Sequence, residues 1–151
     1  MTTWIGVFGA VMLGAVAGVS FVIQQAVNAD LRAGIGSAAW AGFVSYLGGT
    51  VCMLVLAVVL REAVPAMADI HRSHWWAWTG GFFGAVYIAI SILLLPRLGT
   101  TTFVALLVAG QMLASLTFDH YGLLGLVQPS VTPPRLLGAA LLVGGVVLVR
   151  L

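Results

Sequence analysis

Residues 110–120 read Gly-Gln-Met-Leu-Ala-Ser-Leu-Thr-Phe-Asp-His. They close a hydrophobic run that begins near Thr100, yet Gln111, Ser115 and Asp119 recur at intervals of four residues. On a helix this spacing keeps the three side chains within a narrow stripe of one face. In a soluble protein the pattern would indicate an ordinary amphipathic helix, so its meaning depends on the composition around it.

The composition places this chain in a membrane. Of its 151 residues, 62% are hydrophobic and only 7% are charged, whereas soluble domains carry roughly 25% charged residues. A chain so poor in charge is typical of an integral membrane protein whose main partner is the lipid bilayer. Its basic residues are six arginines spread singly along the sequence, so we expect no nucleic-acid partner.

Five apolar runs are long enough, or nearly so, to cross a hydrocarbon core of about 30 Å, which takes about 20 helical residues. None alternates apolar and polar residues as a membrane-spanning β-barrel requires. The predicted fold class is all-α integral membrane, with residues 1–151 forming a single five-helix transmembrane domain. The start, Met-Thr-Thr-Trp, lacks the basic residues of a signal peptide, so we expect the first helix to be retained. The expected helices are 4–28, 37–60, 75–95, 100–118 and 134–149.

Short connections are expected between these helices. Residues 30–36 join the first two, and Ser37 suits the N-cap of the second. The sequence Pro-Arg-Leu-Gly at 96–99 predicts a tight hairpin between the third and fourth helices. Two prolines at 133–134 suit the first turn of the fifth, where a missing N–H is not needed.

Features that suggest metal, thiol or enzyme chemistry are weak. His71 and His74 lie three residues apart but lack the carboxylate or thiol support of metal sites, so we interpret them as interfacial residues and expect no metal or cofactor. Cys52 lies alone inside an apolar run. The sequence has neither the paired carboxylates nor the nucleophile–base spacing that would indicate a membrane enzyme.

The arginines do not indicate which way the chain is inserted. With five helices, one side of the membrane holds as many arginines as the other, although a bias toward the cytoplasm usually sets orientation. This balance favours a chain made in both orientations that pairs as an antiparallel homodimer. Alternatively, the N-terminal amine or unequal depths of the arginines decide one orientation. The two sets are Arg61, Arg72 and Arg135 against Arg32, Arg97 and Arg150.

Polar side chains inside a bilayer are costly and are therefore functional candidates. Gln111 lies near the middle of the fourth helix, where a glutamine needs a partner or a ligand. Gln24 and Asn28 lie one turn apart, and their amides suit either a neutral or zwitterionic solute or hydrogen bonds between helices. Asp119 is a gate or coupling residue or a solvated acid at the interface. The other candidate substrate-binding residues are Tyr46, Tyr87, Ser91 and Ser115.

Helix order places Gln24 and Asn28 at the opposite side of the membrane from Asp119 within one chain. In an antiparallel dimer, these two amides would lie level with Ser115 and Asp119 of the partner. We expect a shared cavity at the midplane, lined by Gln111, Tyr87 and Tyr46 of both chains.

Five motifs then suggest a known family. Together they resemble the small five-helix, YdcZ-like branch of the drug/metabolite transporter (DMT) superfamily, over nearly the whole chain. The last motif is the most specific. In order they are Gln24-x-x-x-Asn28-x-x-Leu31-Arg32, Ser45-x-x-x-Gly49, Trp78-x-Gly80-Gly81-x-x-Gly84, Pro96-Arg97-Leu98-Gly99 and Gly110-Gln111-x-x-x-Ser115-x-x-x-Asp119-His120-x-Gly122.

The resemblance implies a multi-pass protein of the bacterial inner (cytoplasmic) membrane that is half of a ten-helix, inverted-repeat transporter. A second copy of the chain or a paired homologue would complete it, and the resemblance also implies dual topology. The four-helix small multidrug resistance relatives export cations with protons through a glutamate in their first helix. No glutamate occurs in residues 4–28 here, so that mechanism is not carried over.

We therefore expect a secondary transporter of a small organic solute or metabolite, working by alternating access. The alternative is a passive channel for a small ion or solute, formed by the same dimer. A transporter needs a closed polar cavity, whereas a channel needs a continuous path and a filter.

Overall fold

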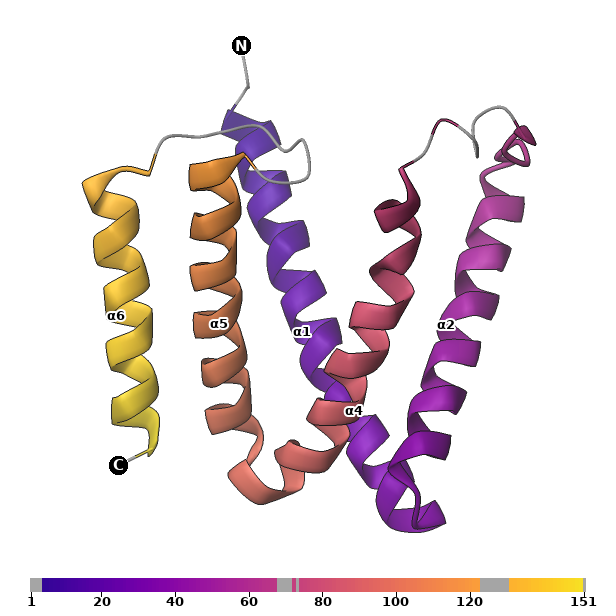
Figure 1. Cartoon of the computed structure of the whole chain (residues 1–151), viewed down its shortest axis with the longest axis horizontal. Helices are drawn as coiled ribbons and strands as arrows, with labels where there is room; N and C mark the ends of the chain where they lie inside the picture. The colour runs from indigo at the N-terminus through magenta and orange to yellow at the C-terminus, as the bar shows by residue number, and fades with distance from the viewer. Residues whose placement is uncertain (1–3, 68–71, 73, 123–130, 151) are drawn as a thin grey trace. The chain divides into compact units, whose positions relative to one another are not determined.

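The computed structural model of the chain describes residues 4–67, 72, 74–122 and 131–150. The described residues contain five long helices and no β-strand (Figure 1), which confirms the predicted all-α class. The chain divides into two compact units, Met1–Pro96 and Arg97–Leu151, and each is described by itself. The helices are α1 (Trp4–Ile35), α2 (Ala38–Val59), α4 (Gly80–Leu98), α5 (Thr100–Tyr121) and α6 (Pro133–Arg150), with a 3-10 helix, η1 (Trp75–Thr79), directly before α4.

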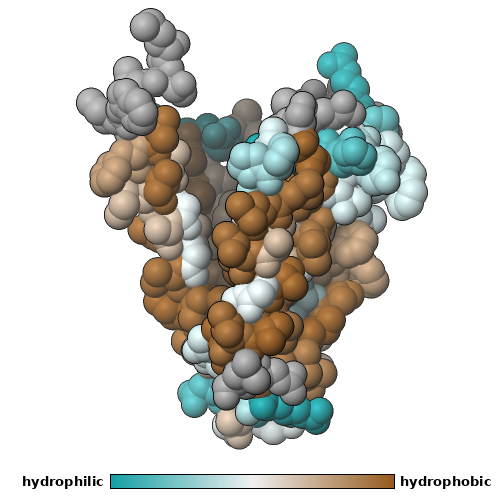
Figure 2. All heavy atoms as spheres, turned by 90° about the vertical axis from the view of Figure 1, so that its left-hand side faces the viewer, coloured by the Kyte–Doolittle hydropathy of each residue, from teal (hydrophilic) through white to brown (hydrophobic). Residues whose placement is uncertain are grey.

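Most of the helical surface is hydrophobic. Figure 2 shows hydrophobic side chains along the length of the helices and hydrophilic ones gathered at their ends. Large apolar side chains are exposed on both units, as Leu13 at 71% and Leu148 at 74% illustrate. Such a surface is stable only in lipid, because water would have to solvate it. Among the residues described, four segments are long and apolar enough to cross a membrane, and Pro133–Val149 is a shorter apolar helix. The four are Gly6–Ile35, Ala38–Val59, Trp75–Leu98 and Thr100–Tyr121.

Helix α1 is longer than predicted and continues to Ile35. The expected connection over residues 30–36 was wrong, because Leu31 packs against a buried cluster that includes Ala41 and Ile92, and this contact keeps the segment helical. The helix ends at Gly36, whose φ of +72° lies in the left-handed region that favours glycine. The predicted N-cap is confirmed, since the Ser37 hydroxyl accepts the Trp40 N–H at 3.3 Å.

Helix α4 also runs further than predicted. It contains Pro96 and ends at Leu98, so the expected four-residue hairpin was wrong and Gly99, with φ +79°, alone separates α4 from α5. A proline has no N–H, so it leaves the carbonyl four residues earlier without its helical donor. That carbonyl belongs to Ile92, and it accepts a hydrogen bond from Nη1 of Arg32 at 2.9 Å. Prolines persist inside membrane helices where a neighbouring group satisfies the freed carbonyl.

Glycines on α2 and α4 leave room for side chains of the facing helix. A Cβ at Gly84 would overlap the hydroxyl of Tyr46, and a Cβ at Gly42 would lie 3.2 Å from Cγ2 of Ile88. Gly84 therefore serves helix packing within the chain. A Cβ at Gly80 would meet nothing within 4 Å.

In the second unit, α5 and α6 pack against each other. Helix α5 ends at a left-handed glycine, Gly122, whose N–H bonds the Phe118 carbonyl. Helix α6 begins at Pro133, one residue before the predicted start, and the Thr132 carbonyl accepts the Arg135 N–H at 3.0 Å. The predicted role of the prolines in the first turn is confirmed.

Candidate solute-binding site

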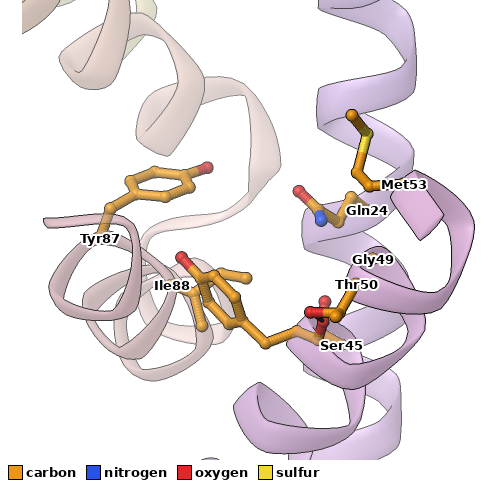
Figure 3. A pocket seen from close by; sticks show the side chains of 8 residues that line it. Gln24, Ser45, Gly49, Thr50, Met53, Tyr87 and Ile88 are labelled. Carbon is orange, nitrogen blue, oxygen red and sulfur yellow. Dashed lines mark hydrogen bonds between the residues drawn. The ribbon is translucent and has the colours of Figure 1, made fainter. Parts of the chain in front are cut away.

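A pocket of about 470 Å³ lies among α1, α2 and α4 in the first unit (Figure 3). Helix α1 contributes an amide, α2 contributes hydroxyls and a thioether, and α4 contributes a phenol and an isoleucine. None of the lining residues is charged. They are Gln24, Ser45, Tyr46, Gly49, Thr50, Met53, Tyr87 and Ile88.

Three of the predicted site residues, Gln24, Tyr46 and Tyr87, thus line one pocket although they come from three helices. In Figure 3 the Tyr87 hydroxyl points across the pocket toward the side that bears Gln24. The Tyr87 ring is held in place by Phe21 of α1, on which it stacks with a centroid distance of 5.1 Å and an interplanar angle of 19°. The pocket is therefore polar at several points on its wall and otherwise apolar.

Two hydroxyls at or near this pocket already donate hydrogen bonds to backbone carbonyls of their own helices. Thr50 Oγ1 donates to the Tyr46 carbonyl at 2.8 Å, and Ser91 Oγ donates to the Tyr87 carbonyl at 2.8 Å. Serine and threonine often bond backbone in this way on membrane helices. In contrast, the Tyr87 hydroxyl has no hydrogen-bond partner within the described part of the chain. The tyrosine is therefore better placed than Ser91 to bind a solute.

Asn28 and its neighbour on the helix, Gln25, are buried rather than pocket-lining, with exposed fractions of 4% and 1%. Asn28 Nδ2 and both amide atoms of Gln25 lack hydrogen-bond partners among the described residues. Gln25 was not among the predicted site residues, because Gln24 and Gln25 look equivalent in a hydropathy reading. The signal that distinguishes them is helical spacing, since Gln25 shares a face with Phe21, Asn28 and Arg32.

Ser115 and Asp119 line a second pocket, of about 530 Å³, between α5 and α6. There Oδ2 of Asp119 lies 3.3 Å from Nη1 of Arg135 in an ion pair whose side chains are 22% and 44% exposed. Arg135 was not among the predicted site residues, although an acid at the end of an apolar helix calls for a nearby cation. The other lining residues are Met112, Leu116, Gly138, Ala139 and Leu142.

Gln111 lies on an exposed part of α5, one turn before Ser115. Its predicted place in a substrate cavity remains a prediction. Of the two histidines considered for metal binding, His71 lies outside the described residues, and His74 stacks on Trp76 with a centroid distance of 4.1 Å. Among the described residues no group of three or more His, Cys, Asp or Glu could hold a metal ion.

Apolar helices of membrane-spanning length define this chain as a multi-pass membrane protein. The family model described as "Putative inner membrane exporter, YdcZ", of the drug/metabolite transporter type, matches residues 9–148. The chain belongs to this family, which confirms the resemblance carried by the five motifs and a multi-pass location in the inner membrane. No curated protein and no solved structure matches the chain.

Proposed function

We propose that the chain is a secondary transporter that moves a small, uncharged or zwitterionic organic solute by alternating access. The observation that carries this proposal is the pocket among α1, α2 and α4, because it presents amide and hydroxyl groups within otherwise apolar helices. Amides and hydroxyls both donate and accept hydrogen bonds. They suit a polar solute without net charge, since an ion would enter the pocket without a counter-charge on its lining.

The proposed assembly is an antiparallel homodimer with ten helices. It is supported by the balance of arginines between the two expected sides of the membrane. Among the described side chains, Arg32 donates to the Ile92 carbonyl and Arg135 pairs with Asp119, and these two arginines come from opposite sets. If such engaged arginines count less toward orientation, the remaining four are still balanced, two against two.

In this dimer, Gln24 and Asn28 of one chain would lie level with Ser115 and Asp119 of its partner. Gln111, Tyr46 and Tyr87 of both chains would line the shared cavity. Solute binding drives exchange between inward-facing and outward-facing states only if its affinity for the two states differs. An ion pair such as Asp119–Arg135, exposed to a pocket, can break and reform during such exchange at little cost.

Transport by the full chain in proteoliposomes tests the function. We expect saturable uptake of at least one labelled solute from a panel of neutral, zwitterionic, cationic and anionic metabolites, and faster uptake when the same solute is preloaded on the other side. Gln24→Ala should lower the rate, whereas Thr117→Val should not, because the Thr117 hydroxyl lies outside the pocket and donates to the Leu113 carbonyl of its own helix. Non-saturable flux without stimulation by preloaded solute would instead identify a passive channel.

A reporter fused to the C-terminus tests the dimer. The wild-type chain should place the reporter on both sides of the membrane, and one arginine added beside Arg61 or beside Arg97 should lock opposite orientations. Each locked form alone should be inactive, and co-expression of the two should restore transport. A wild-type reporter found wholly on one side would rule out dual topology.

A further inference from the structure

Two contacts hold one face of α1 against α4. Phe21 stacks on Tyr87 at 5.1 Å, and Arg32 donates to the Ile92 carbonyl at 2.9 Å. Gln25 and Asn28 lie between these contacts on the same face of α1, because steps of four, three and four residues keep a helical stripe. The two amides therefore belong to the face of α1 that is held against α4.

This face of α1 and the side of α4 that meets it carry polar atoms that lack hydrogen bonds among the described residues. Both amide atoms of Gln25, Nδ2 of Asn28 and the hydroxyl of Tyr87 are buried without a partner in the described residues. The burial is nearly complete, since Gln25 is 1% exposed and Asn28 is 4% exposed. Buried polar groups are almost always paired, so each of these atoms calls for a specific explanation. These three side chains come from the facing sides of α1 and α4, and we refer to them together as the polar cluster.

Tyr87 links this cluster to the pocket of the proposed function. Its ring lies against Phe21 on α1, and the same residue lines the pocket together with Gln24. Gln25 follows Gln24 directly, and Asn28 lies one turn beyond Gln24 on α1. The cluster therefore adjoins the pocket along both α1 and α4.

We propose that Gln25, Asn28 and Tyr87 form an inner subsite that takes an uncharged group able both to donate and to accept, and that this group is a primary carboxamide of the transported solute. The proposal rests on the proposed function for the role of the pocket. The amide of Gln25 offers one donor and one acceptor side by side, which is the complement of a carboxamide. Asn28 Nδ2 and the Tyr87 hydroxyl supply further donors for the solute carbonyl.

Charged groups fit this subsite less well. A carboxylate would lie beside the carbonyl oxygen of Gln25, and Nη1 of Arg32, the cation one turn away, already donates to Ile92. An ammonium group would find two amide oxygens and a phenol but no carboxylate among these residues. Loss of a single neutral hydrogen bond weakens binding by about tenfold. Repulsion between a carboxylate oxygen of the solute and the carbonyl oxygen of Gln25 would weaken binding further.

Binding of two matched probe pairs, nicotinamide with nicotinate and asparagine with aspartate, tests the subsite on the detergent-solubilised full chain. We expect the carboxamide of at least one pair to bind about tenfold or more tightly than its acid. Gln25→Leu and Asn28→Leu should remove this preference. Thr117→Val, whose hydroxyl donates to the Leu113 carbonyl on α5, is the control that should keep it.

Thermal unfolding of the same variants separates a binding role from a packing role. The amide atoms of Gln25 lack hydrogen-bond partners among the described residues. The Gln25→Leu variant should therefore keep or raise the unfolding midpoint, as expected where a binding site lowers stability. Equal binding of amide and acid, or a lowered midpoint with unchanged preference, would overturn the subsite. Saturable transport without an amide preference would leave the proposed function standing, whereas an amide preference without transport of any solute would remove the proposed function and keep the subsite.

Discussion

Nη1 of Arg32 donates to the carbonyl of Ile92 at 2.9 Å, and Ile92 is the residue four positions before Pro96. The proline removes the N–H that would normally bond this carbonyl, so α1 supplies the donor that α4 lacks. One side chain thereby satisfies a backbone group in lipid and ties two helices together.

Arg32→Met should destabilise the protein by about 1.5–3 kcal/mol, the usual range for a hydrogen bond to a charged group. In a Pro96→Ala background the loss should be much smaller, because alanine at that position supplies the missing helical N–H. Unfolding in mixed micelles, followed by tryptophan fluorescence, measures both values. Arg97→Met, in the exposed last turn of α4, is the charge-matched control. Equal losses in the two backgrounds would show that Arg32 does not act through the carbonyl that Pro96 frees.

Gly84→Ala should destabilise the first unit by about 1–3 kcal/mol, the range for overpacking. The new Cβ would overlap the Tyr46 hydroxyl, so Tyr46→Phe should recover part of the loss. Gly80→Ala is the matched control on the same helix, because its Cβ would meet nothing within 4 Å. That change should be neutral or stabilising, since alanine favours a helix over glycine by up to about 1 kcal/mol. Equal effects at the two glycines would contradict the packing of the Tyr46 hydroxyl on Gly84.

Tyr87→Phe should weaken solute binding by about tenfold, the effect of one lost neutral hydrogen bond. Ser91→Ala should change binding less, because the Ser91 hydroxyl donates to the Tyr87 carbonyl on its own helix. Titration of the purified protein with a transported solute measures both affinities. A larger loss for Ser91→Ala than for Tyr87→Phe would assign the binding role to the serine.

Asp119→Asn should change stability by no more than about 1 kcal/mol, because exposed ion pairs contribute little. If the Asp119–Arg135 pair opens and closes during transport, the same variant should lower the transport rate by a larger factor than it lowers binding. Exchange of the two charges in Asp119→Arg with Arg135→Asp should recover part of the rate. A rate that follows stability alone would make the pair a structural contact between α5 and α6.

Hydropathy was sufficient to predict the number, order and approximate bounds of the helices, because lipid demands continuous apolar runs. It failed where polar residues continue a helix. Asp30 and Arg32 made the end of α1 look like a connection, and Pro96 made the end of α4 look like a turn. Contacts between α1 and α4 keep both segments helical. Leu31 of α1 packs against the cluster that includes Ile92 of α4, and Arg32 of α1 donates a hydrogen bond to the Ile92 carbonyl. Every residue has a backbone carbonyl, so the sequence does not show which carbonyl lacks a helical donor. The position of the proline was the only signal from which this hydrogen bond could be inferred.

The candidate site was predicted in part. Scarcity of polar residues in apolar runs identified Gln24, Tyr46 and Tyr87, which line one pocket. The same criterion could not distinguish Gln24 from Gln25, because it records depth along a helix and not rotation about its axis. About 100° of rotation separates neighbouring residues on a helix, and in this protein it separates a pocket wall from a buried cluster.

The helices of this chain also differ widely in length. Helix α1 has 32 residues and α6 has 18, which correspond to about 48 Å and about 27 Å. A hydrocarbon core of about 30 Å is too thin for the first and slightly too thick for the second. We expect α1 to accommodate its mismatch by tilting and the bilayer to thin around α6. We therefore expect the protein to respond to the acyl-chain length of the lipid. A thicker bilayer should increase the length mismatch of α6 and decrease that of α1.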